Sequence, residues 1–214
     1  MANRRADRVD EQYQEKRNRI LKAVRQVVKE VGLRDTQVAM VAEVAGVATG
    51  TVYRYFHSKG ELFAEALATN AQHEVDVIAA IAGADGAAAS RLADAIGVFA
   101  RRAMQTRRLA WATIAEPADP EVDAIRIAYR RTFAEIFEKL IAEGMRHGEF
   151  PHQKAATSAA CVMGALNESL SISLAPEAPE LSDTSTLIDA IIAFSMQALT
   201  ARAYPPLRLV LNKS

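Results

Sequence analysis

Two short helical patterns that meet at a glycine constrain the fold of this chain more than any other feature of its sequence. From residue 37 to residue 45, apolar side chains recur three and four positions apart, which predicts a helix with one apolar face. Gly46 follows, where a chain that leaves a helix often needs a positive φ. A second helix is expected over residues 49–55, too short to persist unless it packs against the first. The pattern predicts a helix-turn-helix, whose second helix enters the DNA major groove.

The outward side of the second helix and the residues around it carry side chains that suit contact with DNA. Arginine can read guanine edges, threonine offers a hydroxyl and a methyl group, and tyrosine, histidine and lysine can bind phosphate. Thr36 is expected to cap the first helix, and Ser58 and Glu61 form a capping box that starts a third helix at Lys59. The residues predicted to contact DNA are Thr36, Gln37, Thr49, Gly50, Thr51, Tyr53, Arg54, Tyr55, His57 and Lys59. Taken alone, such a hairpin fits equally well a piece of core with one solvated face.

The run AGVATGTVYRYFHSKGEL, residues 45–62, resembles the DNA-binding signature of the TetR family of bacterial regulators. The resemblance covers roughly residues 20–67, and the rest of the chain agrees with the family only in its length and helical pattern. It implies a helix-turn-helix regulator whose C-terminal helices pair in a dimer. One position departs from the family pattern, because Ala48 stands where a Ser or Thr commonly caps the recognition helix. The cap is then either weaker or supplied by Thr49.

The chain is neutral overall, but its charge is unevenly distributed. The whole sequence holds 26 Lys and Arg against 26 Asp and Glu, whereas residues 1–60 hold 12 against 7 and the remainder holds 14 against 19. A basic segment that coincides with the helix-turn-helix, joined to an acidic segment, is typical of a DNA-binding module attached to a regulatory domain. Abundant alanine with only 6% aromatic residues favours an all-α fold.

The helical patterns along the chain predict about nine helices in two domains. Residues 1–67 are expected to form the DNA-binding domain, with residues 1–11 as a flexible arm before a supporting helix. Residues 68–206 are expected to form a ligand-binding and dimerisation domain, followed by a tail at residues 207–214. A long helix from Lys59 to about Ile81 joins the domains as a lever that a ligand could tilt. The other helices are predicted at residues 12–31, 88–106, 109–115, 120–146 (capped by Asp119), 153–175 and 184–203.

The last two of these helices carry more apolar surface than the core of one chain needs. A row of small residues lets another helix approach closely, so a four-helix interface between twofold-related chains is expected. The residues predicted at this interface are Ala156, Ala160, Met163, Gly164, Ile188, Ile191, Ile192 and Leu199. The alternative is that the small-residue row packs within one chain, against the long helix that begins at Lys59.

A pocket for a small molecule is expected between the long helix and the helices at residues 88–106 and 120–146. Its candidate lining residues are Phe99, Met104, Trp111, Tyr129 and Phe133, with Asn167 and Glu168 as polar groups. Each of these side chains also fits a place in the core or, for the last two, an interface hydrogen bond. The candidate lining predicts a largely apolar effector.

No pattern of a catalytic, cofactor or metal site is found, so an enzyme is not expected. The acidic group Glu116, Asp119, Glu121 and Asp123 is interpreted as helix capping, and the four histidines lack metal-ligand spacing. No glycine-rich phosphate loop or nucleophile elbow occurs. No apolar run approaches membrane-spanning length and the N-terminus lacks a secretory signal, so a cytoplasmic protein without a membrane partner is expected. The single cysteine, Cys161, is expected in the core.

These features together predict a sequence-specific transcriptional regulator that binds double-stranded DNA as a homodimer. The predicted mode is that of a repressor, released from a palindromic operator when a small effector binds. Two alternatives remain, a constitutive DNA-binding protein and a helical partner-binding protein, both without a small-molecule effector.

Overall fold

The computed structural model describes residues 2–179 and 183–201, and the predicted tail at residues 207–214 lies outside them. Within the described residues the chain forms nine helices and no strand, which confirms the all-α prediction. The helices are α1 (Ala2–Val31), α2 (Val38–Val44), α3 (Thr49–Tyr55), α4 (Lys59–Ala82), α5 (Ala88–Gln105), α6 (Arg107–Ile114), α7 (Pro120–Arg146), α8 (Ala155–Leu174) and α9 (Ser185–Thr200). The predicted bounds of α3, α4 and α7 agree with these to within one residue.

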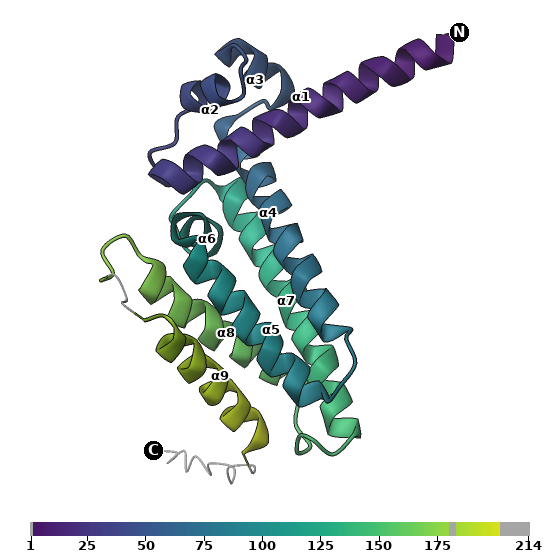
Figure 1. The fold of residues 1–214 in the computed structure, drawn as a ribbon, viewed down its shortest axis with the longest axis vertical. Helices are drawn as coiled ribbons and strands as arrows, with labels where there is room; N and C mark the ends of the chain where they lie inside the picture. The colour runs from purple at the N-terminus through teal and green to yellow at the C-terminus, as the bar shows by residue number, and fades with distance from the viewer. Residues whose placement is uncertain (1, 180–182, 202–214) are drawn as a thin grey trace, which may run out of the picture.

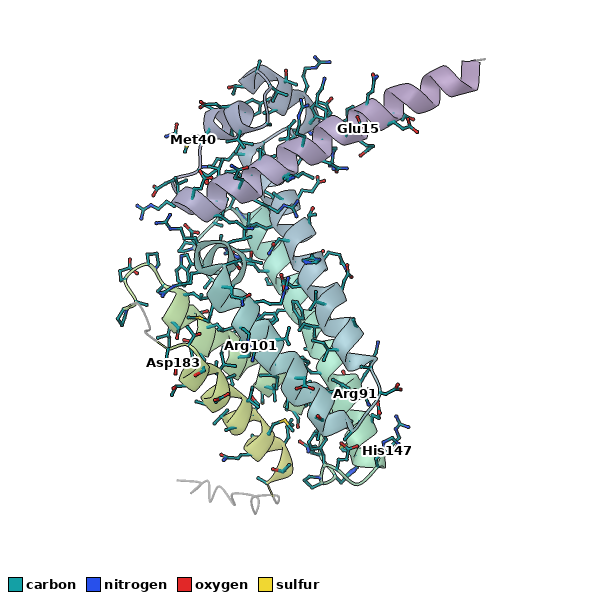
Figure 2. All side chains as sticks on the ribbon, in the orientation of Figure 1. Glu15, Met40, Arg91, Arg101, His147 and Asp183 are labelled. Atoms are coloured by element: carbon teal, nitrogen blue, oxygen red, sulfur yellow. The ribbon has the colours of Figure 1, made fainter. Side chains whose placement is uncertain are left out.

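The helices form a small end, which is predicted to bind DNA and is called the DNA-binding end below, and a longer helical body (Figure 1). α1, α2 and α3 lie at one end, α4 leads away from them, and α7 lies beside α4 along its length. α7 also packs directly against α8, whereas α5 contacts α4, α7, α8 and α9. In Figure 2, Met40 marks the DNA-binding end, whereas Arg91 and His147 mark the opposite end of the body.

Two hydrophobic cores hold this arrangement together. The first lies at the DNA-binding end and is built mainly from α1 to α4, around Ile20, Val24 and Phe56. The second fills the body between α4, α5, α7, α8 and α9, around Ile96, Phe137 and Leu166. Three residues from outside the predicted DNA-binding domain complete the first core, namely Leu109, Ala112 and Val122 of α6 and α7. The DNA-binding end and the helical body therefore pack directly against each other.

Residues 2–11, predicted as part of a flexible arm, form the first part of α1, which begins at Ala2. The segment contains no glycine or proline, so it adds turns to a helix that already has its nucleus downstream. The first part of α1 projects beyond the other helices (Figure 1). Gly32 ends the helix at φ 88°, in the left-handed region that favours glycine.

The predicted caps are only partly confirmed. Ser58 caps α4, since its Oγ accepts a hydrogen bond from the Glu61 amide at 2.9 Å, but the Glu61 carboxylate accepts from the His57 amide, at 2.5 Å. Thr36 does not cap α2, because its hydroxyl donates to the carbonyl oxygen of Gly32 at 2.6 Å. Asp119 stands at the N-cap of α7 without a side-chain cap bond. Ala48 is the N-cap of α3, so Thr49 does not replace the missing cap.

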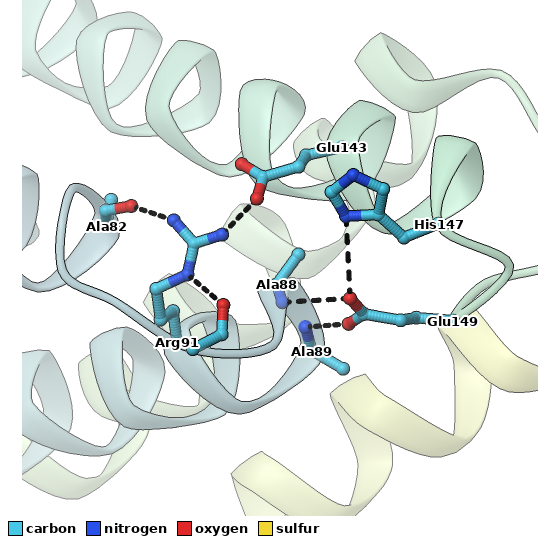
Figure 3. A network of polar contacts seen from close by, with 8 residues as sticks. Ala82, Ala88, Ala89, Arg91, Glu143, His147 and Glu149 are labelled. Atoms are coloured by element: carbon cyan, nitrogen blue, oxygen red, sulfur yellow. Dashed lines mark hydrogen bonds and ion pairs between the residues drawn. The ribbon is translucent and has the colours of Figure 1, made fainter.

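A polar network fastens the end of the body that lies far from α3 (Figure 3). Arg91 donates to the carbonyl oxygens of Ala82, at 2.5 Å, and Gly86, at 3.1 Å, and forms an ion pair with Glu143 of α7. Glu149 accepts from the backbone amides of Ala88, at 3.2 Å, and Ala89, at 2.7 Å. It thereby caps α5, whose own N-cap residue is an alanine. The network joins the α4–α5 turn to α7 and to the segment that follows it.

Candidate DNA-binding face and effector pocket

The outward side of α3 presents most of the predicted DNA contacts to solvent. Tyr53 is 49% exposed, and Gln37, Thr49, Gly50, Arg54, His57 and Lys59 are also exposed, while Thr51 and Tyr55 are half-buried. Tyr55 stacks on Tyr13 of α1, with the ring centroids 4.6 Å apart. Thr36 is fully buried and must be removed from the predicted DNA contacts, because its hydroxyl is turned inward to Gly32.

The inward side of α3 fixes the orientation of this face. Val52 and Phe56 are each 1% exposed in the first core, and the guanidinium of Arg17 lies 5.0 Å from the centroid of the Phe56 ring. Arg17 also forms a bidentate ion pair with Glu65 of α4. Gly46 turns the chain between α2 and α3 at φ 63°, a conformation that favours glycine. The recognition helix is therefore held against α1 and α4 as one unit.

An apolar pocket lies between α4, α5, α6, α7 and α8, and it holds about 750 Å³ of empty space, part of which is open solvent. Its lining includes four of the seven predicted ligand residues, Phe99, Tyr129, Phe133 and Asn167. The Phe99 and Phe133 rings meet edge to face, with centroids 5.0 Å apart. Lining residues that the sequence did not indicate include Leu67, Asn70, Glu74, Arg102, Ile114, Val122, Ile125, Arg126, Arg130 and Met163.

Three predicted ligand residues do not line this pocket. Met104 lies in the core and borders a separate surface hollow beside the start of α9. Trp111 is half-buried against the second core, and Glu168 is exposed on α8. The period of a helix predicts that such residues share an apolar side, but the rotation of each helix about its axis depends on its neighbours.

Three of the polar groups in the pocket have partners in the chain. Arg102 donates from Nε and Nη2 to both carboxylate oxygens of Glu74, at 2.6 and 2.9 Å, and this hydrogen bonding raises the pKa of Arg102. The Tyr129 hydroxyl donates to Oε1 of Gln72 at 3.3 Å. Burial raises the pKa of Tyr129, and the negative charge of Asp76 adds to this, so the phenol stays protonated at neutral pH.

Arg126 is a pocket residue with one buried donor that lacks a hydrogen-bond partner. Its side chain is only 8% exposed. Nη1 donates to Asp123 at 2.7 Å and Nη2 donates to the carbonyl oxygen of Ala112 in α6 at 2.5 Å. Within the part of the chain that the structure describes, Nε is buried without a hydrogen-bond partner. Burial lowers the pKa of the guanidinium, although Asp123 and Glu116 favour its charge.

A buried carboxylate connects the pocket region to the DNA-binding end. Glu116, which follows α6 and is 8% exposed, accepts hydrogen bonds from the backbone amides of Leu33 and Arg34, at 3.3 and 3.0 Å. These amides belong to the turn between α1 and α2. The sequence placed Glu116 only in an acidic group interpreted as helix capping, since nothing local indicates a contact 82 or more residues away. In the sequence, Arg126 is marked only by Asp123 three residues earlier, a spacing at which helical ion pairs are common.

The first turns of α4 and α7 also lie close together. A Cβ atom on Gly60 would come within 2.9 Å of Oε2 of Glu121, so the two helix starts approach at a residue without a side chain. Leu67 and Val122 belong both to the first core and to the lining of the pocket. A guest in the pocket would therefore contact residues that support the recognition helix.

The predicted dimer residues differ in how far their own chain buries them. Ala156, Ala160 and Gly164 are exposed on α8, so the row of small residues does not pack against α4 as the alternative proposed. Four others are buried in the core of their own chain and cannot face a partner as predicted, namely Met163, Ile188, Ile191 and Leu199. Ile192 is half-buried and packs toward α5, where a Cβ atom on Gly97 would meet its Cδ1 at 2.9 Å.

The outer surface of α8 and α9 is nevertheless apolar. Ile172 is 66% exposed and Phe194 is 62% exposed, the two highest values among the large apolar side chains that the structure describes. Cys161 lies on the same outer side of α8, exposed and not in the core as predicted. The excess apolar surface expected from the sequence is present, but different residues of α9 provide it. α9 buries one side against α5 and exposes the other.

Two further properties bear on the kind of protein. None of the described helices is long and apolar enough to cross a membrane. The described residues also contain no cluster of three or more His, Cys, Asp or Glu side chains that could hold a metal ion.

Comparison with known families and structures gives consistent matches over most of the chain. Residues 20–66 match the family described as "Bacterial regulatory proteins, tetR family", and residues 85–171 match the one described as "Tetracyclin repressor-like, C-terminal domain". No curated protein matches the chain at a significant level.

Solved structures of regulators share the fold at low sequence identity. The fatty acid degradation regulator FadR from Bacillus halodurans has a TM-score of 0.74 and 22% identity, over 87% of this chain and 97% of that chain. FadR from Bacillus subtilis, in complex with stearoyl-CoA, has a TM-score of 0.69 and 19% identity, over 87% and 98%. RolR, in complex with resorcinol, has a TM-score of 0.64 and 15% identity, over 92% and 98%.

Proposed function

Since the chain belongs to the TetR family of bacterial regulators, we propose that it represses transcription from a palindromic DNA operator and is released by a small, largely apolar effector. One observation carries the proposal. The pocket and the core beneath the recognition helix share Leu67 and Val122, so a guest contacts the packing that orients α3. An enzyme is not proposed, because the pocket contains no paired nucleophile and base that would support catalysis.

The proposed DNA contacts are the exposed residues around α3. Arg54 is suited to read a base edge, whereas Lys59 and His57 are suited to bind phosphate. In a dimer the two recognition helices would enter successive major grooves about 34 Å apart. Any change in the relative tilt of the two DNA-binding ends would alter that spacing and weaken binding.

The proposed effector acts through a difference in affinity between two settings of the domain. A ligand shifts such an equilibrium only if it binds one setting more tightly than the other. An effector that releases DNA must therefore bind more weakly to the operator-bound dimer. FadR from Bacillus subtilis was solved with stearoyl-CoA and RolR with resorcinol, and the apolar lining of the present pocket suits an apolar part such as the acyl chain of the first or the ring of the second.

The first test asks whether DNA binding is sequence-specific. Duplexes selected from a random pool should compete for the protein far better than scrambled duplexes of the same composition, in fluorescence anisotropy at physiological salt. Equal competition would remove the repressor proposal. If no small molecule then alters operator affinity, a constitutive DNA-binding protein becomes the better conclusion.

Gly50→Ala separates DNA contact from folding. A Cβ atom at Gly50 would meet nothing within 4 Å in the protein, and alanine favours a helix by about 1 kcal/mol over glycine, so the variant should fold at least as stably. Operator affinity should fall about tenfold if the backbone of α3 approaches DNA closely here. Unchanged affinity in a protein with an unchanged melting temperature would remove Gly50 from the DNA contacts.

The outer surface of α8 and α9 is the proposed dimer interface. Gly164 is exposed, and a Cβ atom added to it would meet nothing within 4 Å, so one chain can accommodate a leucine there. Gly164→Leu should weaken the dimer at least about tenfold by disturbing the close approach of two α8 helices. Equilibrium sedimentation measures the effect, with Ala128→Leu at an exposed position of α7 as the matched control. An equally tight dimer of Gly164→Leu would exclude Gly164 from the interface.

A further inference from the structure

The pocket combines apolar walls with one buried cation whose hydrogen bonding is incomplete, and this combination indicates the chemical class of its ligand. We propose that the pocket takes a ligand with a single carboxylate on an apolar body and that Arg126 binds the carboxylate. The inference rests on the proposed function in one respect, because it takes this pocket as the effector site.

Arg126 has both the charge and the free donor that such a ligand requires. A buried polar group without a partner costs free energy, and a ligand oxygen that accepts from it removes that cost. The guanidinium already holds Asp123 and the Ala112 carbonyl oxygen through its two Nη atoms, which leaves Nε without an acceptor among the described residues. Asp123 is 56% exposed on its side chain, so water can replace Arg126 as its partner when a ligand carboxylate competes.

The other cations of the pocket lack either a free donor or burial from water. Arg102 gives Nε and Nη2 to the two oxygens of Glu74, which neutralises its charge and occupies the edge that a carboxylate would use. Arg130 is exposed, so water competes for it and weakens any ion pair it forms. Arg126 is therefore the cation in this lining at which a carboxylate gains most over its binding to water.

The rest of the lining defines the body of the ligand. Phe99 and Phe133 form an aromatic pair, and Ile114, Ile125 and Met163 add aliphatic surface around the same space. These groups can bury an aromatic ring or an unbranched alkyl chain by the hydrophobic effect, and they do not distinguish between the two. The shared chemistry is a monocarboxylate with an apolar body.

The position of Arg126 also connects ligand binding to the DNA-binding end. Its Nη2 holds the backbone of α6 at Ala112, a residue of the first core, and its charge interacts with Glu116, which holds the turn between α1 and α2. A carboxylate at Arg126 would compete with both the carbonyl oxygen and Glu116 for the same guanidinium. Occupation of the pocket therefore weakens contacts that hold α6 and the DNA-binding end in their present positions.

The test measures binding of matched acids and amides by isothermal titration calorimetry, first in the absence of DNA. Decanoate is compared with decanamide, and 4-phenylbutyrate with 4-phenylbutanamide, so that the apolar body stays constant while the charge is removed. At least one acid should bind about 10- to 100-fold more tightly than its amide, the range expected for a charge-assisted hydrogen bond in a buried site. The pair that shows the difference identifies the body as alkyl or aromatic.

Variants then locate the effect. Arg126→Gln should remove the preference for the acid while leaving the amide affinity within about threefold, and Arg130→Gln, which removes the same charge from the exposed part of the lining, should keep the preference. Circular dichroism establishes that each variant folds. If Arg126→Gln does not fold, the comparison of acid with amide in the unaltered protein still decides the question.

Each remaining outcome has a definite meaning. Amides that bind as tightly as their acids, a preference unaffected by Arg126→Gln, or no binding of either acid at millimolar concentration would each overturn the inference. Acids that bind through Arg126 but leave operator affinity unchanged in anisotropy would support the inference and overturn the proposed effector role of the pocket. If a neutral compound released the operator and neither acid did, the result would support the effector role of the pocket and overturn the inference of a carboxylate ligand.

Discussion

The two ends of α4 are held in different ways. At the far end, Arg91 and Glu149 each bind two or more backbone groups and join the α4–α5 turn to α7. At the near end, α4 meets the DNA-binding helices through the ion pair of Glu65 with Arg17, and Glu116 holds the adjacent turn. The Glu116 contact comes from the segment between α6 and α7, close to the pocket. We therefore expect the far end to act as a fixed point and the near end to respond to a ligand.

Arg91→Ala should produce the largest loss of stability, because it breaks the far-end network. The substitution leaves the Glu143 carboxylate and two carbonyl oxygens without their donor. Because the ion pair is only partly buried, with the Glu143 side chain 29% exposed, the expected cost is about 2–3 kcal/mol. Urea unfolding followed by circular dichroism measures the change. Arg101→Ala, at an exposed position of the same helix, is the matched control and should change stability by less than about 0.5 kcal/mol. Similar losses in the two variants would mean that the far end is not anchored by this network.

Glu116→Ala should have a smaller effect on stability but a direct effect on DNA binding. It leaves the amides of Leu33 and Arg34 without their acceptor, at a cost of about 1–3 kcal/mol. Operator affinity should also fall, since the turn that leads into α2 loses its attachment to α6. Asp119→Ala is the control, because Asp119 lies in the same segment but makes no side-chain cap bond. If Glu116→Ala retained full operator affinity, the near end would not be the responsive one.

Local signals in the sequence identified the elements of both ends but not the contacts between them. Gly46 marks a turn of positive φ, Ser58 caps α4, and Pro120 begins α7, and each effect acts within a few residues of its cause. The exposed residues of α3 could be predicted for the same reason. Thr36 is the exception, because its hydroxyl found an acceptor at Gly32, four residues earlier, in place of the start of α2.

The pocket and the outer surface of α8 and α9 depend on how helices rotate against one another. Periodicity placed Met163 and Ile191 on apolar sides, but it could not tell whether those sides meet the same chain or a partner. Glu116 and Arg126 act through backbone groups distant in sequence, to which no residue pattern points. Close helix contact within the chain occurs at Gly97, whereas the glycine singled out from the sequence, Gly164, is exposed.

The smallest predicted effect is a loss of stability as the pH falls. It compares a carboxylate at the near end of α4, Glu61, with one at the far end, Glu149. Hydrogen bonds from backbone amides, chiefly that of His57 to Glu61 and that of Ala89 to Glu149, hold the pKa of each carboxyl below its ordinary value of 4.5. A carboxyl whose pKa is lower in the folded than in the unfolded chain adds stability above its unfolded pKa. This contribution is lost as the pH falls through the folded pKa.

Unfolding free energies measured between about pH 7 and pH 3 should therefore fall below about pH 4.5, and Glu149→Gln and Glu61→Gln should each remove part of that slope. At pH 7 both variants should be less stable than the unaltered protein, and the differences should shrink at the acid end of the range. The loss should be smaller for Glu61→Gln, because the Glu61 side chain is 41% exposed whereas that of Glu149 is 20% exposed, so water screens Glu61 more. Glu15→Gln, at an exposed position of α1, provides the control. A larger slope lost at Glu61 than at Glu149 would place the firmer attachment of α4 at its near end and reverse the assignment of fixed and responsive ends.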